Sequence, residues 1–286
     1  MAAQVATAAP AHRMRTSELH ELAVERVIEA MKERLDAPLD LDEMASIAHF
    51  SPFHFNRFFR EVTGIPPAQF LNALRLEQAK RLLISTELSV TDLCFEVGYN
   101  SLGTFINRFH QLVGLSPSAF RKFAKEFSSF QLKLVRGALG ALQTPGLVPF
   151  APWGTVRTLP GFDGLIFAGL FQRAIPESEP AACTVMIKPG PYRLAAVPDG
   201  RYYVFSVGIP WTVEAWELLT LDGIARGRSD AVHVEKGRPR SAADITLSPK
   251  HVIHPPILAA LPLLVVQRLA GAGGSFPEWC DRMLGV

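Results

Sequence analysis

Two stretches within the first 125 residues repeat the same pattern. Residues 41–70 (LDEMASIAHFSPFHFNRFFREVTGIPPAQF) align with residues 90–120 (VTDLCFEVGYNSLGTFINRFHQLVGLSPSAF), with one extra residue near the middle of the second stretch. Matching landmarks follow in the same order: Phe50 with Tyr99, Phe55 with Phe105, Phe59 with Phe109, Gly64 with Gly114, Pro67 with Pro117, and Phe70 with Phe120. Such a repeat indicates two copies of one supersecondary unit.

Each copy begins with the residues that start a helix. Asp40 and Glu43 stand three residues apart at the start of the first copy, and Ser89 and Asp92 do so in the second. This spacing is the register of a capping box, in which the first side chain accepts from the backbone of the later residue. A short helix is therefore predicted at the start of each copy.

A tight turn and a second helix are expected to follow. Gly98 suits the positive φ that such a turn often needs, whereas His49, at the same place in the first copy, suits it less. Ser51 followed by Pro52 predicts the start of the second helix, and Gly64 predicts its end. Each copy is thus predicted to be a helix–turn–helix.

The second helix of the first copy has two unlike faces. Phe55, Phe58, Phe59 and Val62 recur at i, i+3, i+4 and i+7, which is the buried stripe of an amphipathic helix. Phe53, Asn56, Arg57 and Arg60 fall on the opposite side. A polar face of this kind often only solvates a helix. Two copies of a helix–turn–helix favour DNA binding instead, because this motif places its second helix in the major groove.

A longer helix, predicted from Ala68 to Ser85, joins the two copies. Its eighteen residues would span about 27 Å at roughly 1.5 Å per residue. With the width of the flanking elements added, this length suits two recognition helices about 34 Å apart, which is one turn of B-DNA.

These features closely resemble the AraC/XylS family of transcription regulators, over about residues 22–122. The resemblance rests on a helical lead-in, two helix–turn–helix units, the joining helix, and the segment EVGYNSLGTFINRFHQLVGLSPSAFRK. It implies a sequence-specific transcription factor, of the activator kind, whose partners are double-stranded DNA and RNA polymerase.

The resemblance also implies which side chains meet DNA. In the first recognition helix they are Phe53, Asn56 and Arg57, with Arg60 on the same face, and in the second they are Leu102, Gly103, Ile106 and Asn107. Asn107 stands where the family usually has arginine and Arg108 follows it, so either side chain is a candidate. Cys94 takes a position that is usually alanine, and we expect a small buried filler there rather than a redox group.

The second half has a different composition, rich in Gly and Pro. β-prone runs are predicted at residues 165–171, 183–188, 192–197, 201–209, 232–235 and 245–247. Pro198–Asp199–Gly200 between two of them predicts a hairpin. We therefore expect a multidomain α + β chain, in which an all-α double helix–turn–helix domain precedes a mostly β domain. A β-sandwich is the expected form. Residues 190–209 weakly resemble prealbumin-like, carboxypeptidase-regulatory-type β-sandwiches, and a GyrI-like α/β effector domain is the alternative.

The expected division of the chain follows from these patterns. Residues 1–17 are expected to be a disordered lead-in, 18–126 the DNA-binding domain and 127–151 a linker rich in Gly and Pro. Residues 152–286 are expected to be a β-rich domain that senses a small-molecule effector or mediates oligomerisation.

Catalytic and cofactor motifs are missing from the sequence. It has no G-x-S-x-G, no H-E-x-x-H and no phosphate-binding glycine loop, so we expect no enzyme and no cofactor. His251 and His254 have a spacing that could reach one metal, but a proline follows at once and no metal site is expected. Trp211, Trp216 and Tyr203 are candidates for a ligand pocket, although aromatics in a β domain are more often core.

Two other functions stay open: an enzyme whose β domain does the chemistry while DNA binding serves autoregulation, and an architectural DNA-binding protein without sensing.

The composition of the chain indicates its class and its compartment. The chain is 48% hydrophobic and 20% charged with a net charge of +2, which is globular and gives no strong hint of a nucleic-acid partner. Its three cysteines are far apart, and no apolar run reaches the ~18 residues of a membrane span, so a cytoplasmic protein without a membrane partner is expected.

Overall fold

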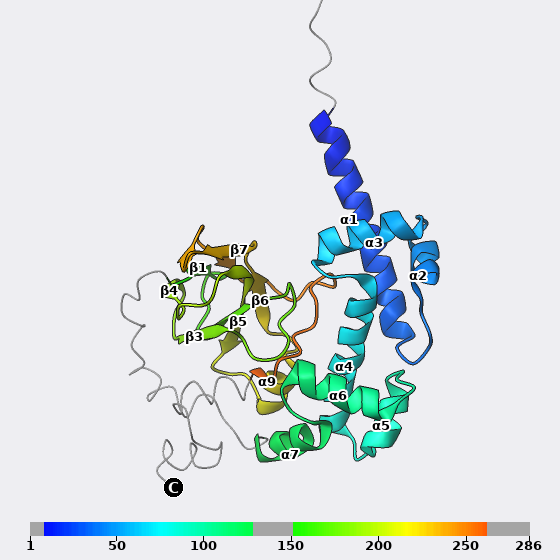
Figure 1. Cartoon of the computed structure of the whole chain (residues 1–286). Coiled ribbons are helices and arrows are strands. Elements are labelled where there is room, and N and C mark those ends of the chain that lie inside the picture. Colours follow the sequence, from blue (N-terminus) through cyan, green and yellow to red (C-terminus); the bar gives the residue numbers. More distant parts are fainter. Residues whose placement is uncertain (1–8, 128–150, 262–286) are drawn as a thin grey trace, which may run out of the picture.

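The computed structural model describes residues 9–127 and 151–261. The first range is all helical, and the helices lie in two groups at the ends of a central helix, α4 (Figure 1). Their bounds are α1 Ala9–Glu33, α2 Leu41–Ala48, α3 Pro52–Thr63, α4 Pro67–Ser85, α5 Val90–Glu96, α6 Leu102–Val113 and α7 Pro117–Phe127. The helical part of the fold prediction is confirmed.

Residues 9–17, which were expected to belong to a disordered lead-in, are helical, because α1 begins at Ala9. A proline at the second position of this helix is compatible with its first turn, and the alanines around it favour helix. Residues 1–8, and the 128–150 part of the expected linker, lie outside the described residues.

The predicted helix ends are largely confirmed. The Asp40 carboxylate accepts from the backbone N–H of Glu43 at 2.9 Å, and the Ser89 hydroxyl accepts from that of Asp92 at 3.1 Å. Gly64 ends α3 with a φ of 89°. His49 takes a φ of 60°, so a residue that suits the left-handed region less than glycine occupies it all the same. Ser51 begins α3 without a side-chain cap hydrogen bond.

The aromatic stripe forms the core of the first helix–turn–helix unit. Phe55, Phe58 and Phe59 are fully buried, and Phe55 packs edge-to-face against both of the others. Val62 is only half-buried, contrary to the prediction of a fully buried stripe. Thr63 is buried in its place, and its hydroxyl is satisfied there because it donates to Phe59 O at 2.8 Å and accepts from Ile65 N–H at 3.3 Å.

The second described range is mostly β. Its elements are β1 Trp153–Arg157, β2 Gly164–Phe171, β3 Ala182–Met186, β4 Gly190–Arg193, β5 Gly200–Pro210, α9 Ala215–Thr220, β6 Ala225–Arg228, β7 Val232–Glu235, β8 Arg238–Pro239 and β9 Ile245–Thr246. One sheet has the order β4-β1-β9, and the other has the order β3-β2-β5-β7-β8 with β6 also paired to β5.

The two sheets curl around one apolar core. Val156 on β1, Ile166 on β2, Val204 on β5 and Ile245 on β9 belong to a single buried cluster. All strand pairs are antiparallel except β1 with β9. A bridge between Arg226 and Ser248 brings the two sheets together at one edge. The finer assignment of a β-sandwich stays a prediction.

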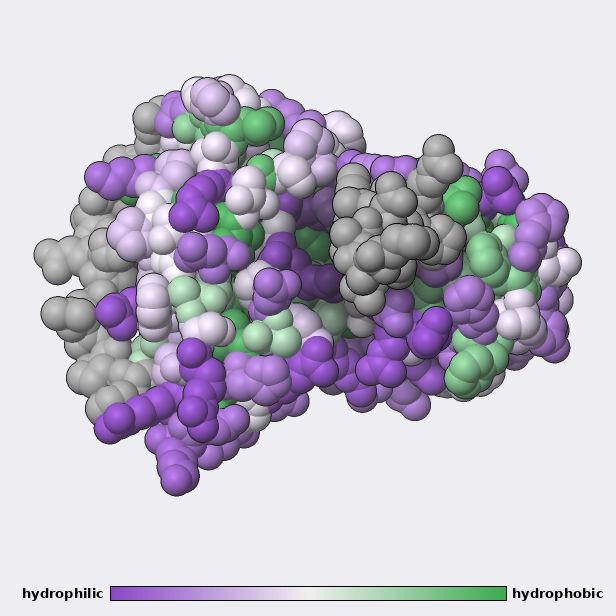
Figure 2. All heavy atoms as spheres, turned by 90° about the horizontal axis from the view of Figure 1, so that it is seen from above, coloured by the Kyte–Doolittle hydropathy of each residue, from purple (hydrophilic) through white to green (hydrophobic). Residues whose placement is uncertain are grey.

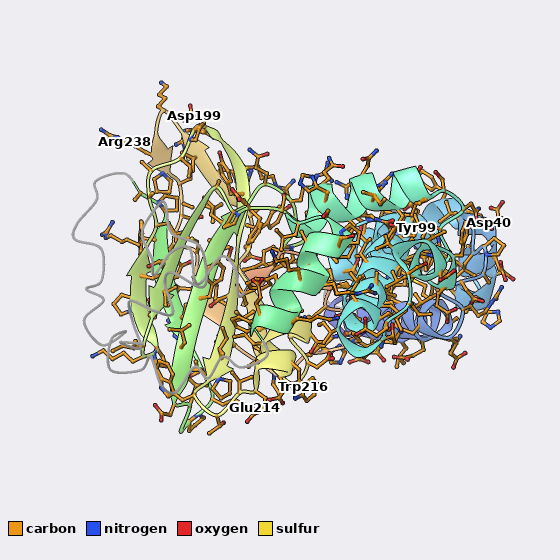
Figure 3. All side chains as sticks on the ribbon, turned by 90° about the horizontal axis from the view of Figure 1, so that it is seen from below. Asp40, Tyr99, Asp199, Glu214, Trp216 and Arg238 are labelled. Atoms are coloured by element: carbon orange, nitrogen blue, oxygen red, sulfur yellow. The ribbon has the colours of Figure 1, made fainter. Side chains whose placement is uncertain are left out.

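The predicted hairpin around Pro198–Asp199–Gly200 is wrong. β4 pairs with β1 and β5 pairs with β2, so the strands on either side of this turn are not partners. Asp199 instead accepts from the backbone N–H groups of Lys236 and Gly237, at 2.8 and 2.7 Å. It thereby holds the turn between β7 and β8, and Asp199 and Arg238 lie together at the upper edge of the β-rich half in Figure 3. Both turn residues have positive φ, which is typical of a two-residue hairpin turn.

The helical half and the β-rich half pack against each other. One buried cluster contains Leu112 and Val113 of α6 together with Trp211 and Leu258 from the second half. Helix α9 contacts both α4 and α7. None of the described helices is long and apolar enough to cross a membrane.

Candidate nucleic-acid interface

The polar face of α3 is open to solvent. Phe53 is 84% exposed, and Asn56, Arg57 and Arg60 are exposed as well. Arg57 lies 3.9 Å from Glu61 in an exposed ion pair, which restrains the guanidinium little. The four side chains predicted from the first repeat therefore share one accessible helix face.

The corresponding face of α6 is more apolar. Gly103, Asn107 and Arg108 are exposed, whereas Leu102 and Ile106 are half-buried and pack against the core. Both Asn107 and Arg108 can reach solvent, so the geometry leaves both as candidates. The exposed hydrogen-bonding groups on this face are fewer than on α3.

The helix α4 holds the two units at its ends (Figure 1). Near the first unit, Arg75 of α4 donates to Leu35 O at 2.8 Å and to Ala37 O at 2.9 Å. Near the second, Arg121 of α7 donates to Leu83 O at 3.3 Å and to Leu88 O at 2.6 Å. Each unit is thus tied to the joining helix by an arginine that bonds backbone carbonyls.

The prediction that Cys94 is a small buried residue is confirmed. It is fully buried in α5, and its Sγ lies 3.8 Å from Tyr99 O. Burial raises the pKa of its thiol, which disfavours the reactive thiolate.

A groove of about 590 Å³ separates the polar face of α3 from the β-rich half. Hydrophilic residues border the recess between the two halves (Figure 2). On the α3 side it is lined by all four predicted side chains, and on the other side by Arg201, Tyr203 and Arg228. The Arg201 guanidinium lies 5.3 Å from the Tyr203 ring centroid and that of Arg228 lies 5.9 Å from it. The basic character of this region thus comes from both halves of the chain.

Helices α3 and α6 are both anchored to the β-rich half at their C-terminal ends. Arg228 donates to Thr63 O at 3.2 Å, in the last turn of α3. Ser178 N–H donates to Leu112 O at 2.6 Å, and Ala260 N–H donates to Val113 O at 3.1 Å, both at the end of α6. The last carbonyls of a helix lack partners within the helix, so these bonds satisfy groups that would otherwise face water.

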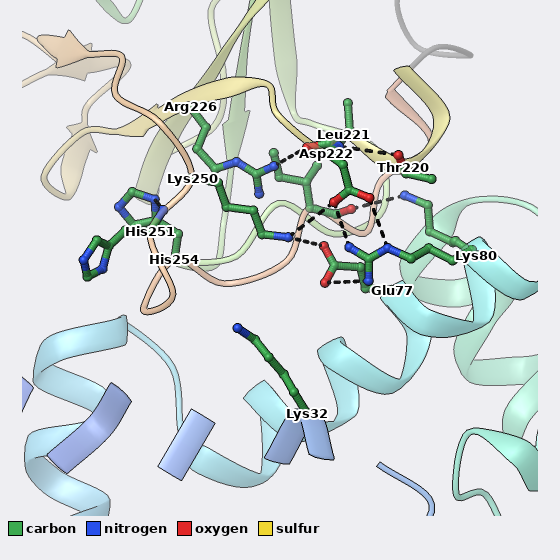
Figure 4. A network of polar contacts seen from close by, with 12 residues as sticks. Lys32, Glu77, Lys80, Thr220, Leu221, Asp222, Arg226, Lys250, His251 and His254 are labelled. Atoms are coloured by element: carbon green, nitrogen blue, oxygen red, sulfur yellow. Dashed lines mark hydrogen bonds and ion pairs between the residues drawn. The ribbon is translucent and has the colours of Figure 1, made fainter. Parts of the chain in front are cut away.

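A charged cluster lies in the contact between α4 and the β-rich half (Figure 4). Arg81 bonds Asp222 at 2.8 Å, and Lys250 bonds Glu77 at 3.0 Å. Lys80 is 2% exposed, and burial lowers the pKa of its ammonium to about 8. Its Nζ donates to Ile257 O at 3.2 Å.

The candidate pocket and metal residues of the second half do not converge. Trp211 is buried, Trp216 is 53% exposed on α9, and Tyr203 lines the groove beside α3. His254 Nδ1 accepts from the backbone N–H of His251. The His251 side chain lies beside the acids Glu21 and Glu25 of α1. These acids stand on a partly exposed helix face, and His251 Nε2 lies 3.7 Å from a carboxylate oxygen of Glu25.

Sequence reasoning missed Arg75, Arg201 and Arg228. Arg75 lies inside a helix whose role was predicted only as a spacer. Arg201 and Arg228 meet α3 across a separation of more than 140 residues, and no local pattern reports such a contact.

Comparison with known proteins identifies the helical half. Residues 44–122 match the model of a family described as a helix-turn-helix domain. The MmsAB operon regulatory protein of Pseudomonas aeruginosa is 36% identical over 96 residues, which are 34% of this chain and 31% of that protein. The bifunctional transcriptional activator/DNA repair enzyme AdaA of Bacillus subtilis is 30% identical over 102 residues, which are 36% of this chain and 48% of AdaA.

Among solved structures, the DNA-binding domain of AdpA in complex with a target DNA is 31% identical. The match covers 36% of this chain and 93% of the AdpA domain, with a TM-score of 0.35. The match to this chain spans less than half of the length of either curated relative. Residues 44–122 of the helical half therefore match a helix-turn-helix domain, and their relatives include regulators of transcription.

Proposed function

We propose that the chain is a sequence-specific regulator of transcription that places α3 and α6 in successive major grooves of double-stranded DNA. The observation that carries the proposal is the exposed polar face of α3, at one end of a joining helix whose other end holds a second unit of the same kind. A helix–turn–helix presents its second helix to the major groove.

The roles of the side chains follow from their chemistry. Arg57 suits a bidentate bond to guanine and Asn56 suits one to adenine, while Phe53 suits contact with a thymine methyl. Arg60 suits a phosphate. On α6, Ile106 suits a thymine methyl, Asn107 or Arg108 supplies the hydrogen bonds, and Leu102 and Gly103 let the groove approach closely. The first unit then carries more of the base readout than the second.

The β-rich half, residues 152–286, is proposed to sense a small-molecule effector, and RNA polymerase is the proposed protein partner. The names of the curated relatives are mostly those of regulators, which supports a regulatory protein without a catalytic step of its own. AdaA is also named a DNA repair enzyme. Its match covers less than half of AdaA, so we carry no repair activity over to this chain.

Selection from a pool of random duplexes tests the proposal. The full chain should enrich one sequence that contains two half-sites about 10 bp apart, because two recognition helices one helical turn apart contact two successive grooves. Substituting single base pairs of that sequence should cost more affinity in one half-site than in the other. Failure to enrich any sequence would contradict the proposal, and equal losses in both half-sites would contradict the unequal readout.

A further inference from the structure

A second cavity, of about 280 Å³, lies where the end of α3 meets the β-rich half. Val62 and Thr63 of α3 form one wall, and Ser206 of β5 with Arg226 and Arg228 of β6 form another. The segment after β9 closes it with Ile253, His254 and Ile257. It differs from the groove beside Phe53 and Asn56, although Arg228 borders both.

The ionisable groups of the described residues that line this cavity are all basic: Arg226, Arg228 and His254. The nearby acids Glu77, Asp222 and Asp230 do not line it, and the first two already pair with Arg81 and Lys250 (Figure 4). Burial first, and then the positive charge of Arg226, lower the pKa of His254 to about 4, which is the effect expected of an electropositive site.

Arg226 has unused hydrogen-bonding capacity. It is 5% exposed, and its Nη2 donates to Leu221 O at 2.7 Å. Its Nε and Nη1 have no hydrogen-bond partner among the described atoms. Buried polar groups are rarely left without partners, and those that lack one need an explanation such as an ion or ligand. Nε and Nη1 lie on different edges of the guanidinium, so each can donate one charge-assisted hydrogen bond to an anionic oxygen.

The rest of the lining is apolar. Val62, Ile253 and Ile257 are side chains that gain from covering a hydrocarbon group rather than water. Inorganic phosphate would leave this surface uncovered, and a cation would be repelled by both arginines. A neutral ligand would form weaker hydrogen bonds with the arginines than an anion does.

We propose that this cavity binds a small organic carboxylate, with its charged end toward Arg226 and Arg228 and its hydrocarbon part against Val62, Ile253 and Ile257. The volume is sufficient for a ring compound, since a cavity of about 150 Å³ already holds benzene. The site is an effector site in so far as the chain regulates DNA binding, which rests on the proposed function.

The position of the cavity supplies a route from ligand to DNA. Val62 and Thr63 belong to the last turn of α3. Arg228 holds that turn through Thr63 O and also donates to Ala174 O at 3.3 Å. A carboxylate that draws Arg228 toward itself weakens the hold on α3. The ligand and DNA then alter each other's affinity by the same factor.

Calorimetric titration of the full chain, without DNA, tests the site. Benzoate is the probe, and benzamide, which has the same shape without the charge, is the comparison. Benzoate at about 10 mM should bind and raise the melting temperature, and benzamide should bind at least about tenfold more weakly because it cannot compensate the arginines. Absence of benzoate binding, or equal affinity for the two compounds, would overturn the proposal.

Two variants locate the binding. Arg226→Gln removes the charge, and Ile253→Trp fills the cavity while keeping both arginines. Each should weaken benzoate binding by at least about tenfold. Arg157→Gln is the control, because Arg157 is an exposed arginine on β1 that does not line the cavity. If Arg226→Gln does not fold, the benzoate affinity of Ile253→Trp alone tests the location of the site. Wild-type affinity in Ile253→Trp would place the ligand elsewhere and overturn the proposal.

Measuring DNA affinity with and without benzoate separates the two proposals. If benzoate binds and no DNA sequence is recognised, the site stands and the proposed function fails. If DNA is recognised and benzoate does not bind, this inference fails and the proposed function stands.

Discussion

At the scale of single residues, Glu77 is the carboxylate on which the contact between the two halves depends. It is 6% exposed. Its Oε1 lies 3.0 Å from Lys250 Nζ and its Oε2 lies 3.5 Å from Arg81 Nη1. It also offsets the charge of Lys80, which is buried beside it on α4. Removing this acid takes away the main charge that offsets the buried Lys80 ammonium.

We predict that Glu77→Ala lowers the free energy of unfolding by roughly 3–5 kcal/mol, the range for breaking a buried ion pair from one side. The matched control is Glu87→Ala. Glu87 pairs with Lys125 at 3.1 Å, but its side chain is 81% exposed, so its loss should cost less than about 1 kcal/mol. Urea unfolding of both variants measures the difference. Equal costs would show that the buried cluster contributes no more than a surface pair.

His254 should make stability depend on pH. Its pKa is about 4 in the folded chain and about 6.5 in an unfolded one. Folding therefore releases a proton between these values. The stabilising contribution is complete above pH 6.5 and is lost as the pH falls toward 4. We expect His254→Gln to lose less unfolding free energy than the wild type over this window, as measured by urea titration at several pH values. His233→Gln, at an exposed position of β7, should follow the wild type; if His254→Gln does so too, the linkage is absent.

Arg57 should carry sequence preference. We expect Arg57→Ala to cost about 1–3 kcal/mol of DNA-binding free energy and to relax the preference at one base pair, because a bidentate bond to guanine is lost. Arg157→Ala is the control, since the two side chains have nearly equal exposure, 63% and 60%, and Arg157 lies on β1. Fluorescence anisotropy with the selected duplex and its single-base variants gives both quantities. If Arg57→Ala keeps the base preference of the wild type, Arg57 does not contact a base.

At the scale of elements, local signals predicted the helices and many of the strands. Caps, glycines and the aromatic period lie within each helix, so a single stretch of sequence is enough to predict it. The strands β2, β5 and β7 are rich in β-branched and aromatic residues and were predicted within a residue or so of their bounds. The elements β1, β6, β8 and α9 were missed. β6, for example, reads ARGR and is a strand because it pairs with β5.

In the candidate site, too, features that depend on local sequence were predictable and features that depend on distant residues were not. The polar face of α3 was predictable because helical period alone separates its two faces. The groove and the cavity were not, since each is closed by residues of β5 and β6 that lie far away in the sequence. The failed hairpin at Asp199 has the same cause: the turn residues are correct, but strand pairing is decided by distant partners.

The glycines that end α3 and α6 offer a matched comparison. Gly64 and Gly114 have nearly the same φ, 89° and 94°. A Cβ on Gly64 would lie 2.1 Å from Arg228 Nη1, whereas a Cβ on Gly114 would meet nothing within 4 Å. We expect Gly114→Ala to cost about 1–2 kcal/mol for the left-handed backbone. Gly64→Ala should cost about 1 kcal/mol more, because Arg228 must also give up its bond to Thr63 O. Equal costs in urea unfolding would mean that Arg228 moves aside without loss.

At the scale of the whole molecule, the two halves are not independent domains joined only by a linker. A single buried cluster runs from the helices α4, α6 and α7 into the segment 257–261 and the strands β2 and β5. The charged cluster around Glu77 lies in the same contact. The proposed division into a DNA-binding domain, 18–126, and a sensing domain, 152–286, therefore concerns function more than independent stability.

Unfolding of the full chain should accordingly be one cooperative transition. All four tryptophans, Trp153, Trp211, Trp216 and Trp279, belong to the second half of the sequence, so their fluorescence reports on that half. Far-UV circular dichroism reports mainly on the helices. Since the halves share a core, both signals should change at the same urea concentration. Two separate midpoints would show that the halves unfold independently.

A fragment that ends at Phe127 extends this test to the helical half alone. The fragment keeps both phenylalanine-rich units and α4, so it should remain helical and bind the selected duplex. It loses the partners of Leu112 O and Val113 O and exposes both of these side chains, which lowers its stability by several kcal/mol on the usual scale of about 25 cal/mol per Å² of apolar area. Its urea midpoint should therefore lie below that of the full chain, with a smaller dependence on urea because less surface is exposed on unfolding. A fragment as stable as the full chain would mean that the contact between the halves adds nothing to the stability of α3 and α6. A fragment that is unfolded would mean that the β-rich half is required for these helices to form.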